Sequence, residues 1–343
     1  MVQRYRGKTA PAWNFCRTWH LNGRKALKPM DSPPTLPTSP AHFTGVDDAA
    51  TRLESAGYLP SPEIAAVAYL ADRMEKPILV EGPAGVGKTD LARALAQALG
   101  RPMIRLQCYE GLDEGKALYE WEYAKQLLYT QLLRDKIGEM VAGTSSLAEA
   151  AERIAGGDAV FFSERFLLPR PILAALLSPT PALLLVDEID KSDPEFEAFL
   201  LEVLADNAVT IPELGTFRAK HLPRVVLTSN NARELSDALK RRCLHLFIDF
   251  PTRERELRII RRRLPQIREQ LAEQIARAVE KLRALDLRKA PSISEAIDWA
   301  QSLVILNADV LSVELVSSTL NLVLKHQADI EKAKPHLREI AQS

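Results

Sequence analysis

The sequence predicts an α/β protein in which helices cover both faces of a parallel sheet, followed by a smaller region made only of helices. Short apolar strands alternate with amphipathic helices over residues 45–251, as expected for a parallel sheet. After Pro251 the helical periodicity continues without strands. The first strand runs directly into a glycine-rich loop and a helix. These three observations define the fold class.

Each element follows from local pattern and end signals. The expected strands are 77–80, 103–107, 182–186, 224–228 and 244–250, with a hairpin over 209–220 that turns at Leu214-Gly215. The expected helices are 47–56, 61–75, 89–99, a long helical stretch over 117–155, 170–177, 194–205, 253–264, 267–285, 292–306 and 312–332. We expect three parts: a disordered basic and proline-rich segment over 1–44, an α/β domain over 45–251, and a helical lid over 252–343.

The composition is that of a globular protein. Apolar residues make up 46% of the 343 residues and charged residues 26%. No run approaches the roughly 20 apolar residues of a membrane helix. Cys16, Cys108 and Cys243 stand singly, which argues against a disulfide framework or a cysteine zinc site and favours the cytoplasm.

Charge is unevenly distributed. Residues 1–30 contain seven Lys or Arg and no acid, so the remaining 38 basic and 45 acidic residues leave a net charge of −7 on 31–343. A mildly acidic body is not the electrostatic footprint of a nucleic-acid binder. The abrupt change in composition also leads us to expect initiation at Met30, or a dispensable basic arm before it.

The strongest motif is an eight-residue loop that matches GxxxxGK[ST] in full, Gly82-Pro83-Ala84-Gly85-Val86-Gly87-Lys88-Thr89. It lies between a strand and a helix, as phosphate binding requires. The glycines let backbone N–H groups surround a phosphate, and the helix N-terminus adds its positive dipole end. We expect Lys88 to reach the β- and γ-phosphates and Thr89 to ligate Mg²⁺. The plainer alternative is a turn that joins strand to helix.

Two acids end the apolar strand at 183–186. Asp187 and Glu188 fall at the carboxyl end of a parallel strand, where α/β sheets bind ligands. We expect Asp187 to hold Mg²⁺ through water and Glu188 to orient the attacking water. In the plainer alternative these acids, with Asp190, cap the next helix.

Two further polar positions complete the pattern. Asn230 follows the strand 224–228 and suits a hydrogen bond to the lytic water or the γ-phosphate, in preference to Asn231. Arg241 and Arg242 precede the last strand, and a guanidinium there suits the nucleotide of a neighbouring subunit. The alternatives are an asparagine turn and a solvated basic helix end.

In this order and spacing, the four elements resemble AAA+ ATPases over residues 45–343. The stretch 186–251 is similar to the MoxR branch, in which an arginine lies ten residues before a Tyr/Phe-Pro pair; here Arg241 precedes Phe250-Pro251. The resemblance implies that Arg241 is the arginine finger and Asn230 the sensor. It also implies ATP and Mg²⁺ as ligands and a homo-oligomeric ring, six subunits being the family expectation.

Three segments look like the ATPase that accompanies aerobic molybdenum–copper carbon monoxide dehydrogenase. They are Gln107-Cys108-Tyr109-Glu110-Gly111-Leu112-Asp113, Glu120-Trp121-Glu122-Tyr123-Ala124-Lys125-Gln126-Leu127-Leu128 and Lys289-Ala290-Pro291-Ser292-Ile293. This resemblance implies a chaperone that matures a client metalloenzyme, with a von Willebrand factor A-domain protein as partner.

The chain departs from the family at one position. MoxR relatives begin a lid helix with a Ser-Pro-Arg pattern, whereas this chain has Ser292-Ile293-Ser294 and no arginine. Arg288 and Lys289 lie just upstream and are the candidates to replace it. Gln107, at the end of the second strand, either reports the nucleotide state or is an ordinary strand-end residue.

Three other functions fit parts of the sequence. A nucleic-acid-associated AAA+ motor or restriction-type subunit is disfavoured by the acidic body. A module that binds ATP without turnover has no use for Glu188. A small-molecule kinase is disfavoured by the helical region after Pro251 and by Arg241.

Overall fold

The protein is described by a computed structural model that covers residues 42–132, 134, 146, 164–212 and 214–342. The expectation of a disordered N-terminal segment therefore falls outside the described residues as far as residue 41. The later part of the predicted helical stretch 117–155 falls outside them almost entirely.

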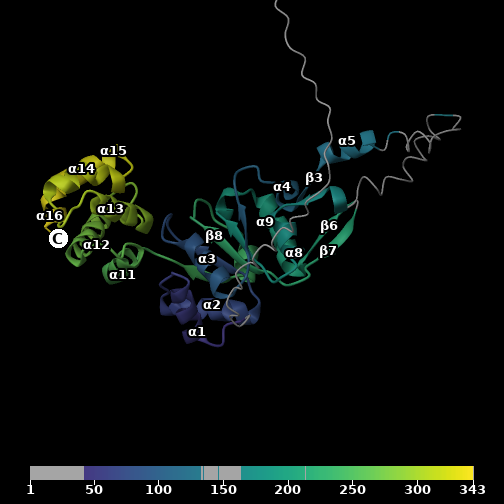
Figure 1. The fold of residues 1–343 in the computed structure, drawn as a ribbon, viewed down its shortest axis with the longest axis horizontal. Helices are drawn as coiled ribbons and strands as arrows, with labels where there is room; N and C mark the ends of the chain where they lie inside the picture. Colours follow the sequence, from purple (N-terminus) through teal and green to yellow (C-terminus); the bar gives the residue numbers. More distant parts are fainter. Residues whose placement is uncertain (1–41, 133, 135–145, 147–163, 213, 343) are drawn as a thin grey trace, which may run out of the picture. The chain divides into compact units, whose positions relative to one another are not determined.

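A five-stranded parallel sheet forms the centre of the chain, in the order β2-β5-β8-β1-β9 (Figure 1). Its strands are β1 (Ile78–Glu81), β2 (Met103–Gln107), β5 (Leu183–Asp187), β8 (Arg224–Ser229) and β9 (Leu244–Phe247). The central strands are buried throughout, because helices cover both faces. Because these strands are parallel, the carboxyl ends of β1, β5 and β8 lie side by side at one end of the sheet.

Alternating side chains along each strand enter two separate apolar cores. On β5, Leu183 and Leu185 belong to one core and Leu184 and Val186 to the other. Figure 1 shows α1, α2 and α3 on one side of the sheet and α8 and α9 on the other. The helices of this part are α1 (Val46–Ser55), α2 (Pro62–Met74), α3 (Lys88–Ala98), α4 (Glu114–Leu118), α5 (Tyr123–Leu132), α8 (Pro171–Leu176), α9 (Pro194–Asp206) and α10 (Asp237–Arg242), with 3₁₀ turns η2 (Glu164–Phe166) and η3 (Ile189–Lys191).

The predicted hairpin is present as β6 (Ala208–Ile211) and β7 (Gly215–Arg218), an antiparallel pair. Gly215 has a φ of 86°, which favours glycine at the turn. The predicted helix over 117–155 is wrong at its start, where β3 (Tyr119–Trp121) pairs with β4 (Leu167–Pro169). Tyr119 and Trp121 pack edge to face, and a partner strand so distant in sequence overrides the helical periodicity.

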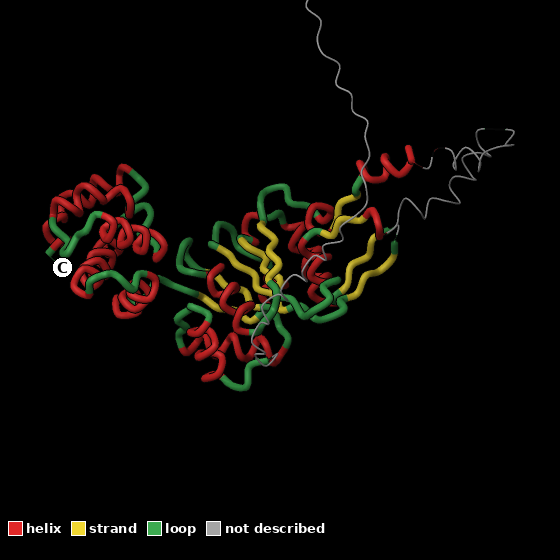
Figure 2. Tube along the Cα trace, in the orientation of Figure 1, coloured by secondary structure: helices red, strands yellow, loops and turns green. Residues whose placement is uncertain are grey.

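The C-terminal region contains helices and no strands (Figure 2). It has its own apolar core. It contains α11 (Arg253–Arg263), α12 (Glu269–Ala284), α13 (Ile293–Ile305), α14 (Val313–Val323), α15 (Gln327–Ala333), η4 (Lys334–His336) and α16 (Leu337–Ala341). Trp299 is fully buried there and donates its indole N–H to Thr319 at 2.8 Å.

The single helix predicted over 312–332 is wrong, because the chain is extended between α14 and α15. Buried Asp329 accepts the backbone N–H groups of Arg288 and Lys289 at 2.8 and 3.1 Å. These bonds dock α15 against the loop before α13, a tertiary contact that local pattern does not contain.

The predicted fold class, a parallel sheet between helices followed by a helical region, is confirmed. Within the residues that the structure describes, no helix is both long enough and apolar enough to cross a membrane.

Candidate active site

The P-loop curls between β1 and α3 at the edge where the strands end. Gly82 has a φ of 149°, and a Cβ at this position would lie 2.0 Å from the carbonyl oxygen of Ile248. Gly85 has a φ of 77°, and its Cβ would lie 2.5 Å from the side chain of Ser292. Only glycine fits at either position, since both the backbone angle and the space exclude a side chain.

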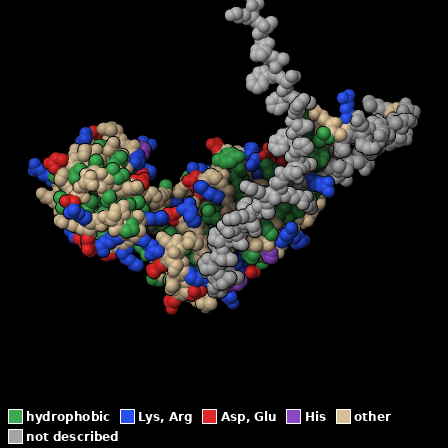
Figure 3. Space-filling model, viewed as in Figure 1, with side chains coloured by type: hydrophobic (Ala, Val, Ile, Leu, Met, Phe, Trp, Pro, Cys, Tyr) green, Lys and Arg blue, Asp and Glu red, His purple; other side chains and the backbone are tan. Residues whose placement is uncertain are grey.

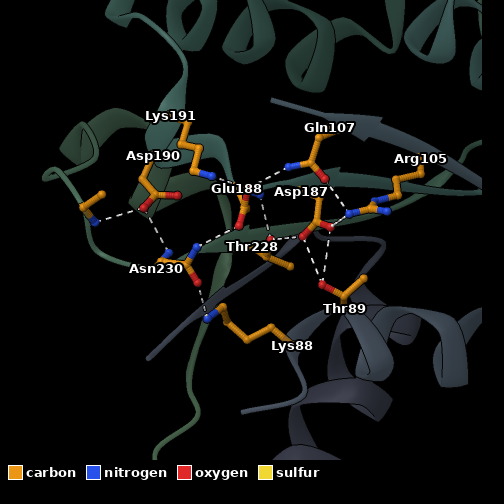
Figure 4. Close-up of polar contacts among 11 residues, drawn as sticks. Lys88, Thr89, Arg105, Gln107, Asp187, Glu188, Asp190, Lys191, Thr228 and Asn230 are labelled. Atoms are coloured by element: carbon orange, nitrogen blue, oxygen red, sulfur yellow. Dashed lines mark hydrogen bonds and ion pairs between the residues drawn. The ribbon is translucent and has the colours of Figure 1, made fainter. Parts of the chain in front are cut away.

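Lys88 lies at the centre of this loop and is buried. Its ammonium donates to the carbonyl oxygens of Gly82 and Pro83 at 2.7 Å. It also donates to Oδ1 of Asn230 at 2.8 Å (Figure 4). Burial lowers the pKa of Lys88, while the charges of neighbouring carboxylates oppose that effect. The P-loop thus holds a positive charge inside its own turn.

Thr89 and Asp187 face one another across the loop. The Thr89 hydroxyl lies 3.2 Å from Oδ1 of Asp187, and the hydroxyl of Thr228 donates to the same oxygen at 2.5 Å. Arg105 on β2 donates to the other carboxylate oxygen at 2.5 Å. Asp187 is almost fully buried, so these contacts satisfy a charge that has little access to water.

Glu188 has a left-handed backbone, with a φ of 58°. Such a conformation is costly for a residue with a side chain and persists only where the surrounding structure holds it, as active sites do. Its carboxylate accepts from Lys191 at 2.7 Å, from the amide nitrogen of Gln107 at 2.8 Å and from Nδ2 of Asn230 at 3.1 Å. Its orientation is therefore fixed from three directions.

Asn230 joins the two halves of the site, because its amide oxygen accepts from Lys88 and its amide nitrogen donates to Glu188. Asn231 instead bonds to the hydroxyl of Ser229. Asp190 accepts the backbone N–H groups of Asn230 and Ala232 at 3.1 and 2.9 Å, and so fixes this loop.

Figure 4 also shows four residues to which the sequence analysis gave no role in the site: Arg105, Asp190, Lys191 and Thr228. A signal existed for Arg105, since it lies two positions before Gln107 and residues i and i+2 of a strand share a face.

A cavity of about 260 Å³ lies over the P-loop. Its lining includes Lys88, Thr89, Asp187, Glu188 and Asn230. The structure thus brings these predicted residues together around one space.

A second cavity adjoins this one and is more apolar. Tyr58, Ile248, Ile259, Ile293 and Ile297 line it, together with P-loop backbone. Burial raises the pKa of Tyr58 to about 12. Charged residues also border this cavity, namely Asp90, Asp249, Arg255, Arg262 and Arg263. A partly apolar cavity beside a phosphate site suits a nucleobase. Sequence reasoning missed these residues, because they come from four distant segments.

Arg241 lies near the amino ends of the parallel strands, whereas the P-loop lies at their carboxyl ends. The strands β1 and β9 run parallel, from Ile78 beside Leu244 to Glu81 beside Phe247. The P-loop follows Glu81, whereas Arg241 precedes Leu244. The Arg241 side chain is exposed. The structure therefore does not bring it to the P-loop of its own chain.

The helical region contributes Ser294 to the cavity over the P-loop. Neither Arg288 nor Lys289 is among the described residues that line the two cavities. The Lys289 ammonium pairs with Glu295 at 3.1 Å. Neither candidate replacement for the absent lid arginine reaches the site in this arrangement.

Comparison with known proteins agrees with this geometry. Residues 77–243 match the AAA domain (dynein-related subfamily). The chain is 26% identical over 239 residues to the gas vesicle ATPase GvpN of Haloferax mediterranei, covering 65% of this chain and 63% of that protein. It is 25% identical over 205 residues to protein NorQ of Paracoccus denitrificans, covering 60% and 64%. The chain thus spans less than two thirds of the length of each relative.

Among solved structures, the RuvB Holliday junction branch migration motor of Thermotoga maritima is 18% identical, with 84% of this chain and 72% of that one covered. The TM-score is 0.41. The family match and the two relatives confirm the expectation of an AAA+ ATPase of the MoxR type. Over residues 77–243 the chain thus has the sequence pattern of an AAA domain of the dynein-related subfamily.

Proposed function

We propose that the chain binds ATP together with Mg²⁺ and hydrolyses it. The observation that carries the proposal is the hydrogen-bonded connection from Lys88 through Asn230 to Glu188 (Figure 4). It links a phosphate-binding cation, a sensing amide and a carboxylate at the edge where the strands end. Such a connection serves a site in which phosphate and water must be positioned together.

The phosphates of ATP have a prepared site at the P-loop. Backbone N–H groups and the N-terminus of α3 attract anions, and the Lys88 ammonium adds a full positive charge. In the described arrangement Lys88 bonds to the carbonyl oxygens of Gly82 and Pro83. A bound β- or γ-phosphate replaces these neutral acceptors with a charged one, which strengthens the bond.

The residues beside the P-loop fit Mg²⁺. The ion takes oxygen ligands at about 2.0–2.1 Å in octahedral geometry, so neighbouring ligands lie about 3 Å apart. The oxygens of Thr89 and Asp187 are 3.2 Å apart. Thr89 would ligate the ion, and Asp187 would hold it directly or through water. When bound, Mg²⁺ neutralises charge on the phosphates.

Glu188 is the residue that orients the attacking water. A water oxygen attacks the γ-phosphorus as the bond to the bridging oxygen breaks, and the water proton passes to a base. The carboxylate of Glu188 borders the cavity over the P-loop and can accept that proton. Asn230 holds it in place and can also contact the γ-phosphate.

Hydrolysis then depends on a ring. Arg241 is exposed and lies away from the P-loop of its own chain. A guanidinium in that position serves the nucleotide of a neighbouring subunit, where it offsets transition-state charge. We take the assembly to be a homo-oligomer, with six subunits as the family expectation. Residues 45–251 would bind the nucleotide, and 252–343 would act as the lid.

The work done is the remodelling or maturation of a client protein. The relatives support an ATPase, and the molybdenum–copper carbon monoxide dehydrogenase client rests on the three resembling segments described above. The β6–β7 hairpin has a largely exposed strand and is a candidate client contact. The other candidate, the stretch 117–155, lies mostly outside the described residues. A von Willebrand factor A-domain protein would accompany the ATPase, and the cytoplasm would be its site of action.

A nucleic-acid role has less support. On the face shown in Figure 3, acidic and basic side chains of the described residues are interspersed, without an extended basic stripe. A DNA shift assay at low and moderate salt separates the two functions, because phosphate contacts give a steep dependence on salt.

The client proposal has its own test. The metal and sulfur content of the dehydrogenase is measured after purification from a strain that lacks this ATPase. The proposal expects a folded dehydrogenase without a mature metal centre. A fully loaded and active dehydrogenase from that strain would contradict the client and leave the ATPase proposal standing.

A further inference from the structure

Arg105 lies beside the site on β2, an edge strand of the central sheet. Gln107 stands next to Asp187 in the parallel register, and Arg105 lies two residues earlier on the same face. The Arg105 side chain is half exposed, whereas that of Asp187 is only 3% exposed. A solvated cation therefore reaches in from the edge of the sheet to a buried anion.

The contacts of Arg105 join two parts of the site. Its guanidinium donates to Oδ2 of Asp187 at 2.5 Å and also to the amide oxygen of Gln107. The other end of that amide donates to Glu188 at 2.8 Å. Because an amide has one accepting and one donating end, Arg105 fixes which end of Gln107 faces Glu188.

Asp187 needs a positive partner when no metal is bound, since a buried carboxylate is costly without one. The ion pairs within the described part of the chain give it Arg105 as its cation. Within the described residues its other side-chain hydrogen bonds are to the neutral hydroxyls of Thr89 and Thr228. The buried Lys88 ammonium is near enough for its charge to act on Asp187, but it makes no ion pair with it there. Arg105 thus supplies at Asp187 the charge that a divalent cation would supply there.

We propose that Arg105 is an internal counter-ion for Asp187, and that Mg²⁺ displaces it when nucleotide binds. The proposal rests on the proposed Mg²⁺–ATP site. The metal and the guanidinium are both cations that seek one carboxylate, so each weakens the binding of the other. Displacement also moves the Arg105 guanidinium, which holds the amide of Gln107. Because that amide donates to Glu188, binding of the metal is coupled to the orientation of Glu188. Arg105 is a positioning residue, because it acts on the nucleotide only through these partners.

The test is a Mg²⁺ titration of the full chain with mant-ADP, read by fluorescence. Arg105→Ala removes the competing cation, so the half-saturating Mg²⁺ concentration should fall about fivefold or more, as for a coupling of ordinary size. Arg105→Gln keeps a hydrogen-bonding side chain without the charge and should show the same fall.

Arg170→Ala is the matched control. Arg170 is also about half exposed and pairs with one carboxylate, that of Glu120. This variant should keep the Mg²⁺ requirement and the turnover of the wild type. An unchanged or raised Mg²⁺ requirement in both Arg105 variants would overturn the inference. If the wild type itself shows no Mg²⁺-dependent binding of mant-ADP, the proposed function fails as well.

Discussion

The Lys88 ammonium lies 2.8 Å from the amide oxygen of Asn230, although 142 residues separate them in the chain. The contact exists because β1 and β8 are neighbours in the sheet and both end at the same edge. The same amide donates to Glu188. Asn230 therefore contacts the phosphate-binding lysine on one side and the carboxylate proposed to orient water on the other.

Asn230→Ala should lower ATP turnover by about 100-fold, which is the cost of removing one well-placed donor from an active site. Nucleotide binding should change little, because Lys88 and the P-loop backbone remain. Steady-state ATPase kinetics and a nucleotide titration measure the two quantities.

Asn231→Gly is the control for Asn230. Asn231 has a φ of 59°, which glycine tolerates, and it bonds only within its own loop among the described contacts. Equal losses of turnover in the two variants would show that the loop matters and that the Asn230 amide does not.

Two inactive variants should restore activity when mixed, if Arg241 acts on a neighbouring subunit. Arg241→Ala has an intact P-loop and Glu188, whereas Glu188→Gln still supplies Arg241. A mixed ring therefore contains some complete sites, and its ATPase rate should exceed that of either variant alone. Arg253 is an exposed arginine on α11 and serves as the control. The Arg253→Ala variant should keep its ATPase rate without mixing. A mixture no more active than its parts would refute a role in trans.

Asp72 should stabilise the fold in a pH-dependent way. It is 3% exposed, and burial raises its pKa, but the Phe43 N–H at 2.9 Å and Arg224 at 3.1 Å outweigh burial, with His42 adding a contact at 3.2 Å. The net pKa lies below the ordinary 3.8. The ionised form is thus favoured in the folded state. Its contribution to stability is present above pH 3.8 and lost as the pH falls below that value.

Asp72→Asn should lower the free energy of unfolding by about 3 kcal/mol at pH 7, because buried Arg224 loses its buried carboxylate partner and keeps only the half-exposed Glu75, at 3.2 Å, among the ion pairs of the described residues. Urea unfolding at several pH values measures the difference between wild type and variant. It should be constant from pH 7 to pH 5 and shrink below pH 3.8. A difference that grows as the pH falls would contradict this reading.

The sequence predicted those features that depend on local chemistry. The strand, glycine loop and helix around Lys88 are adjacent in the chain, and Asp187, Glu188 and Asn230 each follow an apolar strand. Parallel strands place such ends at one edge, so their meeting at the cavity could be anticipated.

The features that sequence reasoning missed depend on contacts between distant segments. The pairing of β3 with β4 joins residues about 48 positions apart, for example Glu120 with Leu168. The apolar cavity combines Tyr58 with Ile248 and Ile293, none of which carries a motif. Arg105 could have been placed on the face of Gln107, but its pairing with Asp187 requires the neighbouring strand.

The central claim is that this site hydrolyses ATP through Glu188. The most direct measurement is phosphate release from ATP by the full chain with Mg²⁺, compared with nucleotide binding, in the wild type, Lys88→Ala and Glu188→Gln. The wild type should bind and hydrolyse ATP. Lys88→Ala should lose binding, and Glu188→Gln should bind ATP and release almost no phosphate. The claim would be contradicted if Glu188→Gln released phosphate at the wild-type rate, or if the wild type released no phosphate from ATP.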